Sequence, residues 1–146
     1  MFDGLTLGDA VLLGSAVGAG LAIAYSDART SQIPAYLLVL LATIGAIWCV
    51  KQSYIPMSLI PIGMGVGVLE LINRCWKRVI GVGDLLLFLA TGLYVPVTIL
   101  GTFFVLCGVL GGVTCAVLRK RACPFAPAIV ISAIATLLLY MYTYPI

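Results

Sequence analysis

Two aspartates, Asp27 and Asp84, stand where long apolar runs of this chain meet polar segments. The chain has only five acidic residues, and a carboxylate placed in an apolar membrane surrounding loses several kcal/mol of solvation, so such positions indicate a functional site. Two carboxyl groups within hydrogen-bonding reach share one proton, which lets one activate a water molecule while the other donates to a developing oxyanion. The pair predicts hydrolysis of a peptide bond by an aspartic-protease mechanism, which needs neither a metal nor a nucleophilic side chain.

The spacing of the two aspartates allows them to meet. They are 57 positions apart, which leaves room for two membrane crossings and a short turn. If the chain leaves one membrane face after its first crossing and returns there before its fourth, both carboxyls lie at the same depth. Helix direction then predicts that Asp84, at the positive start of a helix, is ionised and that Asp27, near the end of one, holds the proton.

The elements that must position this pair are membrane helices. Hydrophobic residues make up 63% of the chain and charged residues 9%, and the mean hydropathy is +1.22, unlike a soluble globular domain. Charged residues, prolines and glycines divide the chain into six apolar runs: 8–26, 34–50, 55–72, 84–96, 97–118 and 126–145. We therefore expect an all-α membrane protein, a single domain over residues 1–146, with about six transmembrane helices in a compact bundle. The start of the chain has no basic segment typical of a cleaved signal peptide, so the first helix is expected to be retained.

The fourth run is short, and only Tyr94-Val95-Pro96 separates it from the fifth, so residues 84–118 could instead form one long broken helix. The basic residues favour six crossings, because seven of the eight then lie on one side of the membrane: Arg29, Arg74, Lys77, Arg78, Arg119, Lys120 and Arg121. The positive-inside rule makes that side cytoplasmic and places both termini outside. Cys49, close to the outer loop, is then expected to be accessible from outside.

The absence of histidine excludes several kinds of site. Without it the chain cannot form a zinc-protease His-Glu-x-x-His helix, a Ser-His or Cys-His nucleophile pair, or a His-ligated haem. The five cysteines show no Cys-x-x-Cys spacing, so we expect no metal and no cofactor. The net charge of +3 is explained by basic residues beside anionic lipid headgroups, and it predicts no nucleic-acid partner.

Other charged and small residues are expected to be structural. Glu70 and Arg74 have the i,i+4 spacing of a helical ion pair, and Asp9 suits a helix cap on the outer side. Glycines at close-packing spacings predict tight contact between helices: Gly14, Gly18, Gly63, Gly65, Gly67, Gly108, Gly111 and Gly112.

Short motifs surround both aspartates. Five residues separate Asp27 from Ile33-Pro34, and Asp84 closes Gly81-Val82-Gly83-Asp84. The two glycines would let an extended substrate backbone approach Asp84, although Asp84 could also be no more than a helix N-cap. With a weaker third motif, Pro124-Phe125-Ala126-Pro127, these stretches resemble the type IV prepilin peptidases, the bacterial branch of the GxGD aspartyl proteases.

This resemblance implies an intramembrane aspartyl endopeptidase in the cytoplasmic membrane, with Asp27 and Asp84 as catalytic residues. It implies substrate contacts from four further residues: Arg29, Pro34, Gly81 and Gly83. The substrate would be a prepilin-like protein, cut at the cytoplasmic face just before its hydrophobic helix. The chain has no cysteine-rich zinc-binding loop, so it is similar to the minimal, peptidase-only form that serves Flp-type or tight-adherence pili, or to an archaeal or conjugative-pilus counterpart.

The chain departs from the family pattern at three positions. Ala35 replaces the usual asparagine after Ile-Pro, Leu86 replaces a frequent lysine, and Ala126 replaces the glycine of the third motif. These changes remove polar support around the pair.

Two other interpretations stay open. One is a non-enzymatic six-span scaffold or a proton-coupled carrier in which the aspartates move protons, and the other is a GxGD protease of signal-peptide-peptidase type. A carrier more often shows internal repeats and acidic residues near the bilayer midplane, and this sequence shows neither.

Overall fold

The computed structural model describes residues 6–52, 55–75, 81–118 and 124–143. These residues form only helices, which confirms the predicted all-α class. In chain order the helices are α1 (Leu7–Thr30), α2 (Ala35–Gln52), α3 (Ile55–Cys75), α4 (Val82–Gly92), the short 3-10 turn η1 (Val97–Ile99), α5 (Leu100–Leu118) and α6 (Ala126–Thr143).

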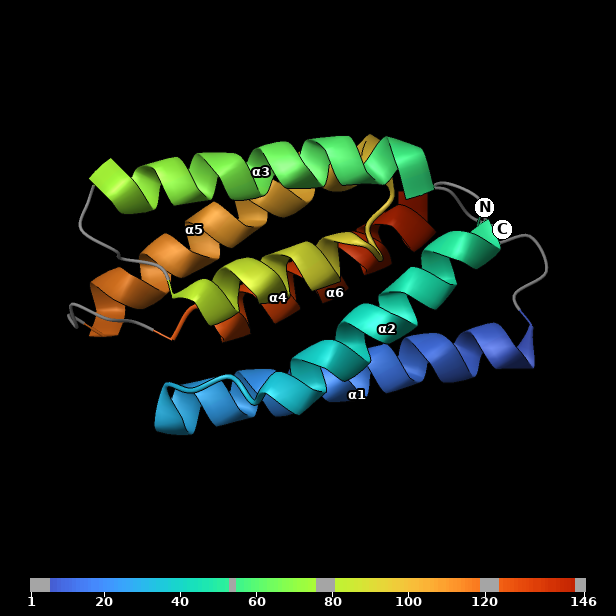
Figure 1. Cartoon of the computed structure of the whole chain (residues 1–146), viewed down its shortest axis with the longest axis horizontal. Coiled ribbons are helices and arrows are strands. Elements are labelled where there is room, and N and C mark those ends of the chain that lie inside the picture. Colours follow the sequence, from blue (N-terminus) through green and yellow to red (C-terminus); the bar gives the residue numbers. More distant parts are fainter. Residues whose placement is uncertain (1–5, 53–54, 76–80, 119–123, 144–146) are drawn as a thin grey trace.

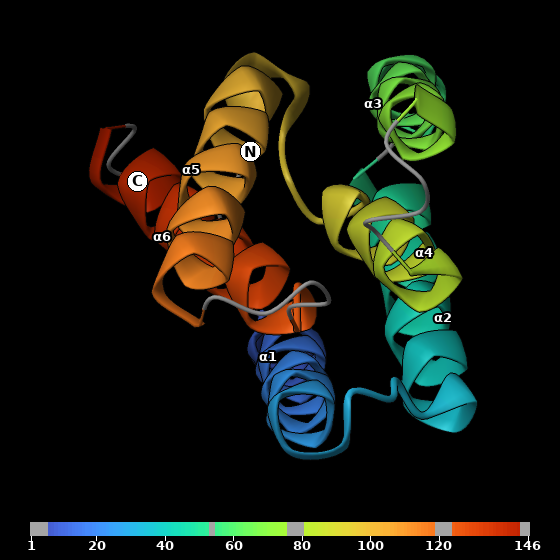
Figure 2. The ribbon, with the colours of Figure 1, turned by 90° about the vertical axis from the view of Figure 1, so that its left-hand side faces the viewer.

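Successive helices run in opposite directions along one bundle (Figure 1). Helix α1 packs against α2 and α6, α5 packs against α6, and α4 packs against α2, α3 and α6. The start of α1 and the end of α6 therefore lie at one end of the bundle. The other end, which faces the viewer in Figure 2, holds the end of α1 and the starts of α4 and α6.

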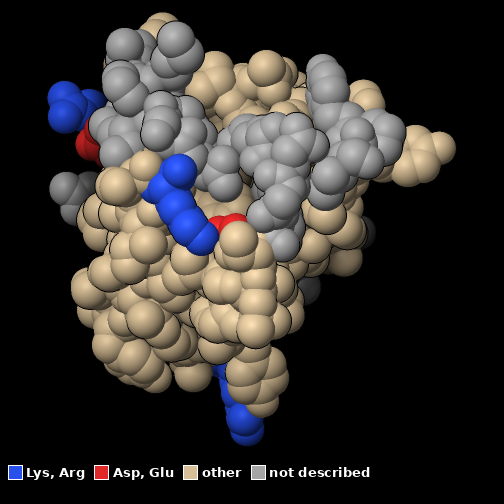
Figure 3. Space-filling view, turned by 90° about the vertical axis from the view of Figure 1, so that its right-hand side faces the viewer, with Lys and Arg blue, Asp and Glu red and all other residues tan. Residues whose placement is uncertain are grey.

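Apolar side chains cover the outside of the bundle as well as its core. Trp48 and Phe103 are almost fully buried, whereas Leu7 is 84% exposed and Tyr142 86%. Charged side chains are few in the space-filling view of Figure 3. Among the described residues, three helices are long and apolar enough to cross a membrane, over Leu7–Thr30, Val97–Val117 and Ala126–Thr143. Three shorter apolar helices cover Ala35–Lys51, Ile62–Leu71 and Val82–Gly92.

Helix α4 ends before the predicted run 84–96 does, so the predicted C-terminal end is wrong. The helix stops at Gly92 and is about 16 Å long. Pro96 opposes a longer helix, because it has no N–H to donate to the carbonyl of Gly92. Residues 94–96 follow as buried irregular backbone, which a membrane tolerates only where protein covers it. Because α4 and α5 are antiparallel in Figure 1, residues 84–118 do not form one long broken helix.

Cys49 is not at the surface. It is 1% exposed, and its thiol donates to the carbonyl of Leu93 at 3.1 Å. The expectation that it is accessible from outside is wrong, because its side chain faces the end of α4. Most of the residues that set the predicted orientation, Lys77, Arg78 and residues 119–121, lie outside the described residues.

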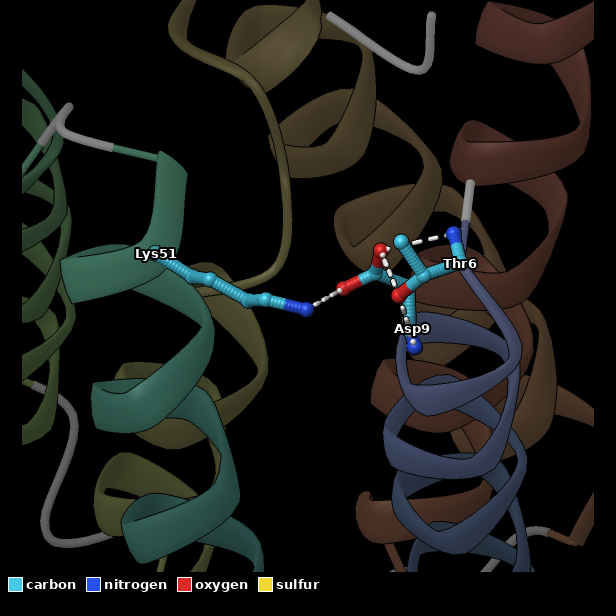
Figure 4. A network of polar contacts seen from close by, with 3 residues as sticks. All are labelled: Thr6, Asp9 and Lys51. Carbon is cyan, nitrogen blue, oxygen red and sulfur yellow. Dashed lines mark hydrogen bonds and ion pairs between the residues drawn. The ribbon is translucent and has the colours of Figure 1, made fainter. Parts of the chain in front are cut away.

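A polar cluster joins the start of α1 to the end of α2 (Figure 4). The Asp9 carboxylate accepts hydrogen bonds from the Thr6 hydroxyl at 2.7 Å and the Thr6 backbone N–H at 2.9 Å. Asp9 thus takes part in capping α1, as predicted, but the N-cap residue itself is Thr6. The Lys51 ammonium forms an ion pair with the second Asp9 oxygen. Asp9 is 7% exposed, so this ion pair neutralises a buried charge between two helices. The predicted Glu70–Arg74 pair is also confirmed, at 3.3 Å on an exposed surface.

We predict that Lys51→Met lowers the unfolding temperature of the bundle, because it leaves the Asp9 carboxylate without its cation. Arg74→Met, in the exposed pair, should cost less than about 1 kcal/mol. Thermal unfolding in detergent measures both. The Asp9→Asn/Lys51→Met double variant should lose less than the sum of the single losses, and strict additivity would show that the two side chains do not interact.

Candidate active site

Asp27 lies in the last turn of α1 and is 5% exposed. The helix ends because Ser31 adopts a left-handed conformation, with φ 53°, and its backbone N–H donates to the Asp27 carbonyl at 2.8 Å. The Ser26 hydroxyl then donates to the carbonyl of Gln32 at 3.1 Å. These local bonds turn the chain sharply towards α2 and leave the Asp27 carboxyl inside the bundle.

Asp84 lies in the first turn of α4, three residues after the N-cap Gly81. Its Oδ2 accepts the Gly81 backbone N–H at 3.2 Å, so this oxygen does cap the helix. Its Oδ1 is buried and accepts no hydrogen bond from the described residues. Capping therefore uses one oxygen of the carboxyl and leaves the other available for a water molecule or a substrate.

The motifs of the two aspartates come together. Asp27, in the last turn of α1, and Asp84, in the first turn of α4, lie at the same end of the bundle. On the backbone, a Cβ added at Gly83 would lie 3.3 Å from the Ile33 side chain. Gly83 thus provides the space in which the loop after α1 packs against the start of α4.

A third segment reaches the site from α6. The backbone N–H of Ala126, the first residue of that helix, donates to Asp27 Oδ2 at 3.1 Å in a buried position. The sequence analysis noted the motif around Ala126 but assigned it no role. The feature that could have pointed to it is the pair of prolines, Pro124 and Pro127, at the start of the last apolar run. Asp27 lies at the negative end of the α1 dipole but beside the positive end of the α6 dipole. These two effects oppose each other, so helix direction alone does not predict which of the two aspartates is protonated.

The other predicted site residues lie on the segments next to the two aspartates. Pro34 begins the turn into α2, where its carbonyl accepts the N–H of Leu37 at 3.1 Å. The Arg29 guanidinium donates to the Tyr25 hydroxyl at 3.0 Å on an exposed surface. Gly81 is exposed beside Asp84.

An apolar cavity of about 380 Å³ opens next to the site. It lies between α3, α4 and α5, and the segment before α6 also contributes to it; its lining residues are Met64, Gly65, Val68, Leu69, Phe88, Phe104, Cys107 and Phe125. Phe88 is one helical turn after Asp84, and Phe125 directly precedes Ala126. The cavity therefore borders both segments that carry the carboxyl contacts.

Chemically, the arrangement is two carboxyls with one backbone donor each. In the described part of the chain, no group of three His, Cys, Asp or Glu side chains could hold a metal ion. Two neighbouring carboxyl groups that are partly shielded from water do not readily ionise together. They share one proton, so that one can act as a general acid and the other as a general base.

These features define a helical membrane protein with a two-carboxylate site. The chain belongs to the type IV leader peptidase family, whose model matches residues 4–117 and so includes both aspartates. This confirms the resemblance that the aspartate motifs indicated, and it makes the protein a member of a peptidase family. No curated protein and no solved structure matches the chain. Helix α6, which supplies the donor to Asp27, lies outside the matched range.

We predict that Ala126→Pro lowers peptide-bond cleavage by roughly tenfold or more, because proline has no N–H to donate to Asp27. Proline is compatible with the first position of a helix, so α6 should still form. Ala126→Gly retains the N–H and should cleave at close to the wild-type rate. Cleavage of a leader-bearing substrate in detergent micelles is the measurement, and equal rates for the two variants would contradict the role of this hydrogen bond.

Proposed function

We propose that this chain is an intramembrane aspartyl endopeptidase that removes the leader peptide of prepilin-like substrates, with Asp27 and Asp84 as its catalytic residues. The observation that supports it most is the position of these two carboxyls, which come from separate helices and lie at the same end of the bundle, inside a member of a leader peptidase family. Family membership favours this activity over a scaffold or a proton-coupled carrier.

The proposed chemistry uses the shared proton of the pair. The ionised carboxyl takes a proton from a water molecule as the water oxygen bonds to the peptide carbon, and the protonated carboxyl donates to the carbonyl oxygen. Breakdown of the tetrahedral intermediate breaks the C–N bond and returns a proton to the leaving amine. The buried Oδ1 of Asp84, which the described residues leave without a donor, is suited to hold that water.

Substrate binding is proposed for the residues around the two carboxyls. Gly81 is exposed next to Asp84, and Arg29 and Pro34 lie on the loop side of Asp27. Gly83 is proposed to act indirectly, because the Ile33 side chain occupies the space beside it. The apolar cavity, lined by Phe88 one turn after Asp84 and by Phe125 next to Ala126, is proposed to receive part of the hydrophobic helix of the substrate.

We also propose six crossings of the cytoplasmic membrane, with both termini outside and the aspartates near the cytoplasmic face. The alternating directions of α1 to α6 support this arrangement, and Arg29 and Arg74 both lie at the bundle end that holds the aspartates, as the positive-inside rule expects. The lack of a Cys-x-x-Cys zinc motif supports the minimal form of the enzyme, as in Flp-type or tight-adherence pilus systems.

We predict that Asp27→Asn and Asp84→Asn each lower cleavage at least ~100-fold, because an amide cannot exchange the shared proton. Folded protein should be recovered in normal amounts, since an asparagine oxygen still accepts a backbone N–H. Glu70→Gln is the matched control: it alters an exposed acidic residue on α3 and should leave cleavage unchanged. Cleavage at near wild-type rate by either asparagine variant would refute the two-carboxylate mechanism.

The orientation can be tested with two engineered thiols in a variant whose five native cysteines are replaced by alanine. Gln32→Cys is exposed at the end that holds the aspartates, and Thr143→Cys is exposed at the end of α6. In intact cells, a membrane-impermeant maleimide should label Thr143→Cys and should label Gln32→Cys only after lysis. The reverse pattern would invert the proposed topology.

A further inference from the structure

One glycine of α5 differs from its neighbours in what it contacts. A Cβ built at Gly111 would overlap the ring of Phe125, whereas Cβ atoms at Gly108 and Gly112 would meet nothing within 4 Å. Gly111 is buried and Gly112 is exposed. The predicted role in helix packing is therefore supported at Gly111, where the absence of a side chain brings a ring against the α5 backbone.

The ring that occupies this space is directly connected to the site. Phe125 immediately precedes Ala126, whose N–H donates to Asp27 Oδ2 at 3.1 Å. The Phe125 carbonyl accepts the N–H of Ile129 at 3.2 Å, which is a first-turn bond of α6. The position of Phe125 thus determines where α6 begins and where the Ala126 N–H points.

A displaced Phe125 ring is expected to carry the start of α6 with it, because the neighbouring backbone is stiff. Pro124 and Pro127 restrict the backbone on both sides, because each proline has a fixed φ. Ala126 is 0% exposed, so a shift of this segment changes its buried contacts, including the hydrogen bond to Asp27. The cavity of about 380 Å³ beside Phe125 gives the ring room to move, so a larger residue at position 111 does not have to unfold the bundle.

We propose that Gly111 is a positioning residue for Asp27: by seating the Phe125 ring against α5, it places the start of α6 so that the Ala126 N–H donates to the carboxyl. This inference rests on the proposed function for its effect on catalysis. The geometric part, from Gly111 through Phe125 to the Ala126 N–H, does not depend on the activity.

The test compares neighbouring glycines of the same helix in the full-length protein in detergent micelles. Gly111→Ala should lower kcat at least about tenfold with little change in KM, the loss expected when a buried acceptor is left without its donor. Gly112→Ala adds the same methyl group one residue away, into open space, and should stay within about twofold of wild type.

A second variant tests whether the effect passes through the ring. In Gly111→Ala/Phe125→Leu, the new methyl group occupies the volume of the lost ring edge, so cleavage should recover to within about threefold of wild type. Phe125→Leu alone leaves that volume empty and should cleave less well than the double variant. A double variant no more active than Gly111→Ala would overturn the proposal.

Amide hydrogen exchange separates the positioning from the activity. In Gly111→Ala, the Ala126 amide should exchange at least about tenfold faster than in wild type or Gly112→Ala, because its acceptor has moved away. If exchange and cleavage both match wild type, the ring has moved into the cavity alone and the proposal is wrong. If exchange accelerates while Asp27→Asn and Asp84→Asn still cleave, the positioning stands and the proposed function fails.

Discussion

A carboxyl group inside an apolar bundle needs hydrogen-bond donors, and here the donors are backbone N–H groups at the starts of helices. Asp84 accepts the N–H of Gly81 before α4, and Asp27 accepts the N–H of Ala126 at the start of α6. A helix start offers unpaired N–H groups together with the positive end of the helix dipole. The placement of the start of α6 beside the end of α1 fits this requirement, whereas Asp84 takes its donor from the start of its own helix.

The acidic side chains at the two ends of the bundle have different kinds of partner. At the start of α1, Asp9 is neutralised by Lys51 and capped by Thr6, so its negative charge is balanced within the structure. At the other end, the described residues give Asp27 and Asp84 neutral backbone donors and no cation. The first arrangement contributes to stability, whereas the second would let two neighbouring carboxyls share one proton, as the proposed mechanism requires.

The sequence predicted the all-α class, the Asp9 cap and the Glu70–Arg74 pair, because composition and i,i+4 spacing are local signals. It overestimated the length of the fourth helix, because the apolar run continues through residues 94–96, which are buried as irregular backbone after the helix ends at Gly92. It placed Cys49 at the surface because the distance to a loop says nothing about which side a side chain faces. It did not predict the hydrogen bond from Ala126 to Asp27, because that donor is 99 residues away and belongs to the backbone.

The use of backbone donors has a consequence for how the protein can vary. Every residue except proline offers the same N–H, so exchanging the side chain at position 126 leaves the bond to Asp27 in place. Alanine can stand there instead of glycine without loss of the donor. Alanine scanning would therefore not detect the backbone donors of the two carboxyls. The side chains around the site can also change during evolution while both carboxyls keep these donors.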